Sequence, residues 1–344
     1  MRLAVNARVT AFSMGGQQRV TAEILKRLGA VDSVAPSRPL GGVRGHAWEQ
    51  FALPMLTAGK LLWSPSATGP VVKRDQVVTL HDVAFLDHPE YFSANFVRAY
   101  RAILPPLVKR AAKVVTVSKF SRRRIAEAYG LDEDSIEVIG NGVGSQFRRY
   151  DRTEIDATRA ALDLPARYIL LQATSDRRKN LAGALAAWAR ALPRLPDDLH
   201  LVVSGNLARA HVFGDHGPIG DAPRAKLVGF VADEHMGPLM AGAETFLFPS
   251  IYEGFGLPIV EAMACGAPVI TSAATATQEI AGNDALLVDP MSAEAIAQAI
   301  VRLAHDAALR SDLSARGVTR ASQFSWDAAA ERYRELFRSL GAEL

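Results

Sequence analysis

Residues 245 to 264 constrain the fold of this 344-residue chain more than any other stretch. The apolar run Thr245–Phe248 has the length and composition of a buried strand, and Pro258 begins a segment with the pattern of a helix. Gly254 and Gly256, in the loop between them, permit a sharp turn and leave backbone N–H groups open toward an anion. The stretch therefore predicts a strand, a tight loop and a helix N-terminus of an α/β protein.

Two carboxylates flank this loop. Glu253 lies within it, and Glu261 lies in the first turn of the expected helix. A carboxylate does not help to bind a bare phosphate, but it accepts hydrogen bonds from hydroxyl groups. Amides for a diphosphate and carboxylates for diols together indicate a site for a nucleotide-sugar.

The same residues carry a family resemblance. Glu253 and Glu261 stand eight positions apart around Gly-Phe-Gly-Leu-Pro, and Ala-Met-Ala-Cys-Gly-Ala-Pro-Val-Ile follows. This pattern resembles the Glu-x7-Glu signature of the retaining glycosyltransferases of family 4. The resemblance implies the α/β GT-B fold, in which two Rossmann-like, doubly wound domains face each other across a cleft. It also implies that Glu253 binds hydroxyls of the transferred sugar and Glu261 the ribose diol. The donor site would further include Gly254, Phe255, Gly256 and Leu257.

Length and composition agree with a two-domain globular protein, since 49% of the residues are hydrophobic and 22% are charged. Cys265 is the single cysteine, which excludes an internal disulfide framework. The first residues show no signal-peptide pattern, and no window reaches the roughly 20 apolar residues of a spanning helix. We therefore expect a cytoplasmic protein whose contact with a membrane would be peripheral.

Charge is distributed unevenly along the chain. Residues 1–160 contain 23 Lys and Arg against 15 Asp and Glu, whereas residues 161–344 contain 16 against 21. A basic half attracts anionic lipid, a diphosphate-bearing acceptor or nucleic acid, and a merely solvated basic surface remains the alternative. We do not expect nucleic acid as a ligand, because the sequence lacks the Cys and His spacings of zinc-binding modules and lacks basic helices interleaved with aromatic residues. The expected membrane-facing cluster is Lys109, Arg110, Lys113, Lys119, Arg122, Arg123 and Arg124.

The chain begins with a strand at Leu3–Val5, a loop that contains Gly15 and Gly16, and a helix over Arg19–Leu28. Its glycines do not form Gly-x-Gly-x-x-Gly, so a dinucleotide fingerprint is not met. The family resemblance implies that the backbone at Gly16 faces the donor phosphates. The alternative is a flexible turn without a ligand.

His81 follows one of two short strands that we expect, at Leu61–Ser64 and Val77–Leu80. Open α/β sheets bind ligands at the carboxyl ends of their strands, which is where His81 would lie. The segment after it resembles the corresponding segment of polysaccharide mannosyltransferases of family 4. This resemblance implies a contact between His81 and the donor sugar or the acceptor, not a role as general base.

Two further features of the first half bear on the expected fold and chemistry. A helix over residues 94–112 should be interrupted by Pro105 and Pro106. Asp132-Glu133-Asp134 matches the Asp-x-Asp motif that binds a divalent metal in another glycosyltransferase fold. Because these acids lie between a helix and a strand, we interpret them as capping a turn and expect no catalytic metal and no other cofactor.

In the second half, a hinge is expected between Leu162 and Arg167. It separates an acceptor-binding domain (1–162, with the final helix at 326–344 crossing back onto it) from a donor-binding domain (163–325). Arg178-Lys179-Asn180 matches the family's Arg-Lys-Asn, whose cations stabilise the leaving diphosphate. Ala173 and Arg177 depart from the family pattern, where glycine and often proline stand. Val231 ends a segment that resembles the strand contacting the base, and residues 206–224 have the composition of a surface loop.

Together these features predict a metal-independent, retaining glycosyltransferase with Arg178, Lys179, Glu253 and His81 in its catalytic site. The resemblance favours GDP-mannose as donor and a glycan or lipid-linked oligosaccharide acceptor in surface polysaccharide assembly. UDP-glucose, UDP-N-acetylglucosamine and dTDP-rhamnose remain open as donors. A nucleotide-sugar-binding protein without turnover and a sugar-nucleotide epimerase remain alternatives of other classes, although an epimerase does not fit the two glutamates.

Overall fold

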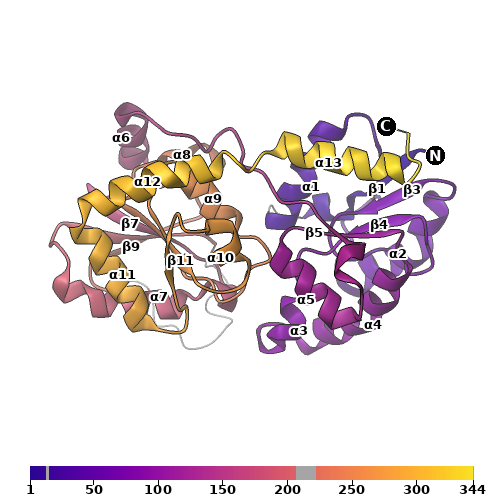
Figure 1. Ribbon diagram of the computed structural model, residues 1–344, viewed down its shortest axis with the longest axis horizontal. Coiled ribbons are helices and arrows are strands. Elements are labelled where there is room, and N and C mark those ends of the chain that lie inside the picture. The colour runs from indigo at the N-terminus through magenta and orange to yellow at the C-terminus, as the bar shows by residue number, and fades with distance from the viewer. Residues whose placement is uncertain (13–14, 207–221, 344) are drawn as a thin grey trace. The chain divides into compact units, whose positions relative to one another are not determined.

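The computed structural model describes residues 1–12, 15–206 and 222–343. In these ranges the chain forms two compact units, each built around a parallel six-stranded sheet (Figure 1). The first unit comprises Met1–Gly142 and Ser325–Leu344, and the second comprises Val143–Phe324. Parallel strands need crossover connections, and helices supply them in both units. The expected α/β class and doubly wound sheets are confirmed.

The sheet of the first unit has the strand order β2-β1-β3-β4-β5-β6. Its strands are β1 (Leu3–Asn6), β2 (Asp32–Val34), β3 (Leu61–Ser64), β4 (Gln76–Thr79), β5 (Lys113–Thr116) and β6 (Ile136–Val138). Its α-helices are α1 (Gly16–Leu28), α2 (Gly42–Leu56), α3 (Ala84–Asp87), α4 (Ala94–Arg110), α5 (Lys119–Tyr129) and α13 (Trp326–Ser339). The chain extends the sheet first on one side of β1 and then on the other. The switch point of this sheet therefore lies between β1 and β3.

The final helix α13 is attached to the first unit by a buried aromatic cluster. The ring of Trp63 on β3 lies 5.0 Å from that of Tyr333 and 5.8 Å from that of Phe337. Trp63 Nε1 donates a hydrogen bond of 3.0 Å to Thr79 Oγ1, and the Tyr333 hydroxyl lies 3.1 Å from the same oxygen. Each polar atom of the cluster has a hydrogen-bond partner, so burial of the three rings leaves no polar atom of the cluster unpaired. Burial of the rings therefore stabilises the attachment of α13.

The sheet of the second unit has the order β12-β11-β10-β7-β8-β9. Its strands are β7 (Arg167–Gln172), β8 (Leu199–Ser204), β9 (Ala225–Gly229), β10 (Thr245–Phe248), β11 (Val269–Ser272) and β12 (Leu286–Val288). Its α-helices are α6 (Arg152–Ala161), α7 (Leu181–Ala191), α8 (Asp233–Ala241), α9 (Leu257–Ala264), α10 (Thr275–Ala281), α11 (Ala293–His305) and α12 (Ala307–Ala321). Strand β10 pairs with β7 on the side opposite β8, and the later strands extend the sheet in that direction. The switch point therefore lies between β7 and β10.

The boundary between the units lies at Gly142 and Val143, about twenty residues before the hinge expected from the sequence. Helix α6 packs against α8, and Phe147 joins the hydrophobic core of the second unit. The stretch from 143 to 162 thus belongs to the second unit. The polar surface of α6 concealed this in the sequence, because Thr158 is its single fully buried residue.

Three other elements differ from the sequence-based expectations. Helix α4 runs without a break through Pro105 and Pro106, so the expected interruption is wrong. Burial of Leu104 and Leu107 within the core offsets the backbone hydrogen bonds that the prolines remove. Strand β2 and helix α2 were not anticipated, since neither has a clear apolar period. The expected loop at 206–224 falls mainly outside the described residues.

Candidate functional site

The site in the second unit is built from the loops that follow β7 and β10. These strands are neighbours on either side of the switch point, so both loops leave the sheet at its carboxyl edge. The loop after β7 includes a 3-10 turn, Arg177–Lys179, and the loop after β10 leads into α9. Topology therefore brings together two sequence motifs that lie far apart along the chain.

Lys179 and Glu253 form an ion pair between these two loops. Lys179 Nζ lies 2.6 Å from Glu253 Oε1, and both side chains are largely buried. Ser250 Oγ lies 2.7 Å from the same carboxylate oxygen. The ammonium also lies 5.1 Å from the ring centre of Phe248, at the end of β10. A positive group is thus held in place at the switch point, where it would be positioned for an anionic ligand.

Backbone contacts lock the two loops to each other. The N–H of Ile251 donates to the carbonyl of Arg178 at 2.7 Å. Asn180 adopts a left-handed conformation with φ of 55°, and its side-chain amide donates to the carbonyls of Pro249 (3.1 Å) and Pro290 (2.7 Å). Asparagine tolerates this conformation better than most residues do. The Arg-Lys-Asn sequence thus supplies both the cations and the clamp that positions them.

Arg178 is engaged by an acidic neighbour within its own turn. Its guanidinium donates to both carboxylate oxygens of Asp176, at distances between 2.6 and 3.1 Å. Burial raises the pKa of Asp176, but the hydrogen bonds and charge of Arg178 outweigh burial and leave that pKa below its ordinary value. Asp176 therefore stays ionised and fixes the orientation of Arg178, which leaves Lys179 as the cation directed at Glu253.

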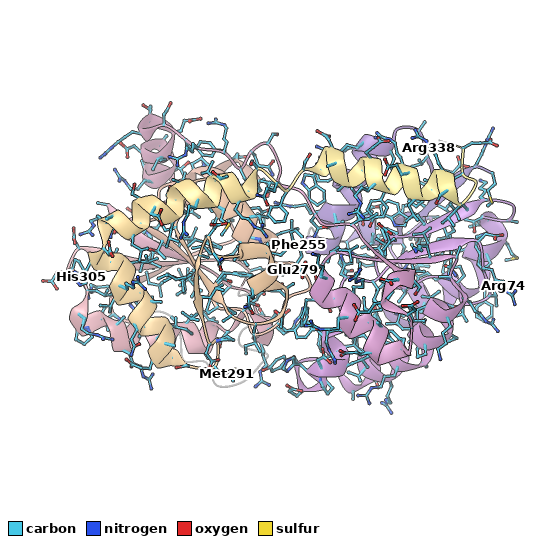
Figure 2. The ribbon with its side chains drawn as sticks, in the orientation of Figure 1. Arg74, Phe255, Glu279, Met291, His305 and Arg338 are labelled. Carbon is cyan, nitrogen blue, oxygen red and sulfur yellow. The ribbon has the colours of Figure 1, made fainter. Side chains whose placement is uncertain are left out.

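Helix α9 begins directly after the glycine loop. Gly256 adopts a left-handed conformation with φ of 95°, which a residue with a side chain would enter only with strain. Phe255, which is labelled in Figure 2, is buried. Its ring packs edge-to-face on that of Phe324, with ring centres 5.7 Å apart. Leu257 is the first helical residue and Pro258 follows it, so the helix starts one residue earlier than expected. The first turn of α9 thus directly follows the loop that contains Glu253.

Glu261 and Val231 are both buried within the second unit. Glu261 lies on α9 and is only 5% exposed, although it carries a carboxylate. Val231 lies in the connection between β9 and α8. Both residues therefore lie in the interior of the second unit, and their contact with a donor stays a prediction.

The remaining two predicted residues belong to the first unit. His81 follows β4 and is buried, with Nε2 2.9 Å from the carbonyl oxygen of Pro65. Burial lowers the pKa of His81 more than the contacts with Pro65 and Asp82 raise it, which favours a neutral imidazole. Gly16 is the first residue of α1 and is exposed, and a Cβ there would meet no atom within 4 Å. Among the described residues of the first unit, none would clash with a side chain at position 16.

A polar network at the switch point of the first unit was missed in the sequence. The buried carboxylate of Glu49 on α2 accepts hydrogen bonds from Asn6 Nδ2 (2.9 Å), Arg8 Nε (3.0 Å) and Thr68 Oγ1 (2.9 Å). A Cβ on Gly45 would lie 2.4 Å from Arg8 Nη1, so glycine makes room for the guanidinium. The signal available in the sequence was Asn6-Ala-Arg8 at the carboxyl end of the first strand.

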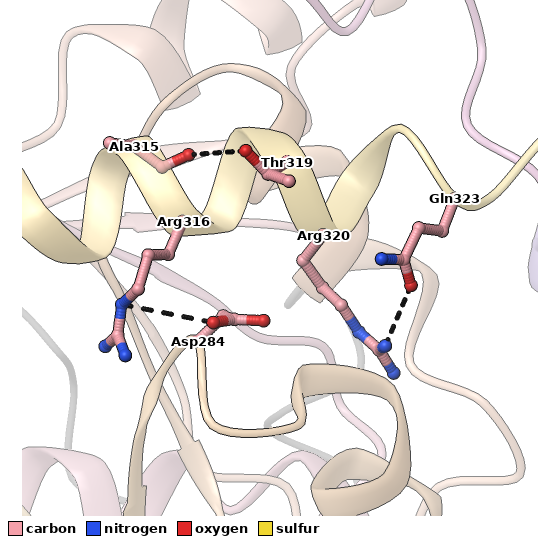
Figure 3. A pocket seen from close by; sticks show the side chains of 6 residues that line it. All are labelled: Asp284, Ala315, Arg316, Thr319, Arg320 and Gln323. Atoms are coloured by element: carbon pink, nitrogen blue, oxygen red, sulfur yellow. Dashed lines mark hydrogen bonds and ion pairs between the residues drawn. The ribbon is translucent and has the colours of Figure 1, made fainter.

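Two other candidate features have structural explanations. Asp132 caps the 3-10 turn Glu133–Ser135, because its Oδ1 accepts from the N–H of Asp134 at 3.1 Å. A surface hollow of about 260 Å³ lies beside α12 and contains none of the predicted site residues (Figure 3). There Arg320 donates to the carbonyls of Glu279 and Ile280 at the end of α10. Its guanidinium thus caps a helix C-terminus.

The described residues offer neither a metal-binding group nor a membrane-spanning helix. Residues 1–12, 15–206 and 222–343 contain no group of three His, Cys, Asp or Glu side chains that could hold a metal ion. Within the same ranges, no helix combines the length and the apolar composition that crossing a bilayer requires.

Family models match both units of the chain. One described as "Glycosyltransferase Family 4" matches residues 57–147, and one described as "Glycosyl transferases group 1" matches residues 167–306. The matched ranges include His81, Arg178, Lys179, Glu253 and Glu261.

Among curated proteins, the chain is similar to mannosyltransferases of two bacteria. It is 33% identical over 254 residues to O-antigen chain mannosyltransferase B of Escherichia coli, an alignment that covers 73% of this chain and 67% of that protein. Over 241 residues it is 30% identical to O-antigen chain mannosyltransferase RfbU of Salmonella typhimurium. This alignment covers 67% of this chain and 61% of that protein. A match of 27% identity to the serotype-specific mannosyltransferase WbdA of Escherichia coli spans about a third of that longer protein.

Solved structures share the fold at lower sequence identity. The chain superposes on Anabaena HepE, described as a complex with UDP and glucose, with a TM-score of 0.79 at 21% identity over 98% of this chain and 99% of that one. For WaaG, described as a glycosyltransferase involved in lipopolysaccharide biosynthesis, the TM-score is 0.74 at 18% identity over 97% and 99%. The two Rossmann-like units are those of the GT-B fold.

Proposed function

This chain belongs to glycosyltransferase family 4, and we propose that it transfers mannose from GDP-mannose to a glycan or lipid-linked oligosaccharide acceptor. The proposed process is the assembly of a surface polysaccharide. The mannosyl assignment draws support from the three relatives above, of which two are named as O-antigen chain mannosyltransferases and one as a serotype-specific mannosyltransferase. The proposed location is the cytoplasm, with peripheral contact at the inner face of the membrane.

The observation that carries the proposal is the Lys179–Glu253 pair at the switch point of the second sheet. In the proposed reaction, negative charge accumulates on the departing diphosphate as its bond to the sugar breaks. Lys179, Arg178 and the amides from Gly254 to Leu257 would stabilise that charge. Their positions are fixed before substrate arrives, since the clamp of Asn180 and the Asp176–Arg178 pair hold the turn. Preorganised charge of this kind needs no rearrangement during the reaction.

Donor recognition would divide between the two glutamates. Glu253 would accept hydrogen bonds from hydroxyls of the mannosyl group, and Glu261 from the ribose diol. Val231 would lie against the base, and Gly16 and His81 of the first unit would contribute to the phosphate and sugar sites. The HepE structure, described as a complex with UDP and glucose, supports a nucleotide-sugar as the ligand of this fold.

We further propose that the sugar is transferred with retention by attack on the face that the diphosphate leaves, with a phosphate oxygen accepting the proton of the acceptor hydroxyl. Glu253 Oε1 already contacts Lys179 and Ser250, an arrangement that suits recognition of hydroxyls better than attack on carbon. The two cations are proposed to take the place that a metal ion has in other glycosyltransferases, so transfer would not depend on one.

A thermal-shift panel of GDP, UDP, dTDP and CDP, each with its common sugar conjugates, tests the donor. A ligand at 100 times its dissociation constant adds about 2.7 kcal/mol of stability, which is a measurable shift. The proposal predicts stabilisation by GDP and GDP-mannose. Stabilisation by UDP-glucose, UDP-N-acetylglucosamine or dTDP-rhamnose instead would move the assignment to that donor. A shift without any slow donor hydrolysis would indicate a binding protein that lacks turnover.

A further inference from the structure

Helix α2 of the first unit carries three large apolar side chains on its exposed face. Val43 is 85% exposed, Phe51 75% and Met55 73%, and they recur at multiples of four residues along one side of this 15-residue helix. The fully buried residues of the helix are Gly45, Glu49 and Leu53. An amphipathic helix of a globular protein normally has the reverse arrangement.

The polar network around Glu49 explains why α2 keeps this orientation. Its carboxylate is buried and accepts hydrogen bonds from Asn6, Arg8 and Thr68, and His46 Nδ1 lies 3.3 Å from the second oxygen. A rotation of α2 that buried Phe51 would expose Leu53 and leave the guanidinium of Arg8 without its counterion, which costs several kcal/mol. The network therefore holds the apolar side outward.

Neighbouring segments extend the exposed apolar surface. Leu56 ends α2 at 53% exposure, and Val72 is 66% exposed. Gln50 holds the segment of Val72 beside α2, because its side chain bonds to the carbonyl of Gly69 and the N–H of Val71. We call Val43, Phe51, Met55, Leu56 and Val72 the α2 patch. Exposed apolar side chains that gather on one surface of a monomeric protein are characteristic of an interaction site.

The charges around the α2 patch are predominantly positive. From Asp32 to Asp75 the sequence contains five Lys and Arg residues against three acids, and one of these acids, Asp32, pairs with Lys60. Arg38, Arg44 and Arg74 are exposed, and none has an ion pair among the described residues. Arg74 projects from the surface of the first unit (Figure 2). Because Glu49 is buried and Asp32 is paired, Asp75 is the one exposed acid left in this stretch, and the charge beside the apolar side chains is mainly positive.

The basic cluster of α4 and α5, expected from the sequence as the membrane surface, is different. Arg124 pairs with Asp87 and Glu127, and Arg122 lies 3.5 Å from a carboxylate oxygen of Glu133. Between residues 74 and 206, moreover, no large hydrophobic side chain is exposed. This cluster therefore lacks the apolar component that inserts into a lipid interface.

We propose that the α2 patch lies on an anionic lipid surface, with Phe51 and Met55 inserted among the acyl chains and Arg38, Arg44 and Arg74 at the headgroups. Apolar insertion and attraction to anionic lipid together give stable peripheral binding, whereas either alone is weak. The inference rests on the proposed function, in which the acceptor is lipid-linked, and it assigns the membrane contact to a defined surface of the first unit.

Vesicle co-sedimentation of the full chain tests this assignment independently of sugar transfer. The probes are vesicles of phosphatidylcholine alone and of phosphatidylcholine with about one third phosphatidylglycerol. The parent protein should bind the anionic vesicles. The double variant Phe51→Ser, Met55→Ser should bind them at least about tenfold more weakly, because two inserted apolar side chains are lost.

The matched control is the double variant Phe230→Ser, Met291→Ser in the second unit. These side chains are of the same types and are 78% and 72% exposed, but they are not part of the α2 patch. The control should bind anionic vesicles as the parent does. Equal losses in the two double variants would overturn the proposal, as would equally strong binding of the parent to neutral vesicles.

A second comparison separates the two basic surfaces. The charge reversals Arg44→Glu, Arg74→Glu should weaken binding more than Lys109→Glu, Arg123→Glu, although each pair changes the net charge equally. The opposite order would assign the membrane contact to α4 and α5 and overturn the proposal. The proposal would also be overturned if the Phe51→Ser, Met55→Ser variant bound vesicles as the parent does but changed its oligomeric state. The α2 patch would then join copies of the chain. Thermal shift with GDP, measured on every variant, reports on the donor site separately.

Discussion

Lys179 and Glu253 are 74 positions apart in the chain, yet Nζ of the lysine lies 2.6 Å from Oε1 of the glutamate. Each follows the carboxyl end of one of the two strands, β7 and β10, that border the switch point. The pair therefore results from the strand order and from the loops together. It places a lysine ammonium beside a carboxylate at the edge of the sheet where this fold class binds ligands.

The first prediction concerns the charge of Lys179. Lys179→Ala should lower the rate of donor cleavage about 100- to 1000-fold, because one preorganised contact to the developing diphosphate charge is lost. Release of the nucleoside diphosphate measures the rate. Arg177→Ala is the matched control, since Arg177 is the exposed cation of the same turn. Its rate should stay near that of the parent, and an equal loss in both variants would show that turn charge in general is responsible.

The second prediction concerns the chemical role of Glu253. Its carboxylate is engaged by Lys179 and Ser250, so we expect no covalent bond between Glu253 and the sugar. Intact-protein mass spectrometry during turnover should detect no glycosylated protein. Glu253→Gln should reduce cleavage while the shift with the nucleoside diphosphate persists. A glycosyl adduct that maps to Glu253 would establish a double-displacement mechanism instead.

The third prediction concerns the ribose. A carboxylate that accepts from a ribose hydroxyl is worth about 1.5–3 kcal/mol. Glu261→Gln should therefore weaken binding of the nucleoside diphosphate roughly tenfold or more. The 2′,3′-dideoxy nucleotide provides a matched control, because parent and variant should bind it about equally. If the variant lost the same affinity for both nucleotides, Glu261 would be acting on the structure of α9 and not on the diol.

The fourth prediction concerns the buried carboxylate of Glu49, which faces Arg8, His46 and Tyr100. Burial raises its pKa, but its hydrogen bonds and the charge of Arg8 outweigh burial, so the folded-state pKa lies below the ordinary value of 4.5. A lowered carboxyl pKa stabilises the fold above that ordinary value, and the stabilisation is lost as the pH falls toward the folded-state value. Glu49→Gln should therefore reduce the unfolding free energy by about 3 kcal/mol at pH 7.

Urea unfolding across a pH series measures this effect. The difference between parent and Glu49→Gln should shrink as the pH falls below 4.5. Glu90→Gln, at a largely exposed position of the same unit, should change stability little at any pH. A difference for Glu49→Gln that stayed constant down to pH 3 would mean that packing, and not the charge of Glu49, stabilises the network.

The fold was predicted from the sequence because local patterns carry it, and the same patterns mark the two loops of the candidate donor site. The strands β7 and β10 are continuous apolar runs, and Gly256 and Asn180 mark the two turns that the site requires. The contact between Lys179 and Glu253 could not be derived from spacing alone, since it depends on which strands are neighbours.

Helix α2 and its network escaped prediction for a physical reason. Its buried face is defined by Glu49 and its exposed face by Phe51 and Met55, which inverts the pattern that identifies a surface helix. The unit boundary at Gly142 was missed because α6 is polar along most of its length and packs on α8 through a narrow face. In both cases the structure is determined by tertiary contacts, which the local sequence pattern does not reveal.

The most direct test of the central claim is cleavage of GDP-mannose by the purified chain, followed by release of GDP and of mannose in the absence of acceptor. The account predicts slow cleavage by the parent, little or none with UDP-glucose, and a loss of about 100-fold or more in Lys179→Ala. Binding of GDP-mannose without any cleavage, or cleavage that Lys179→Ala leaves unchanged, would contradict it.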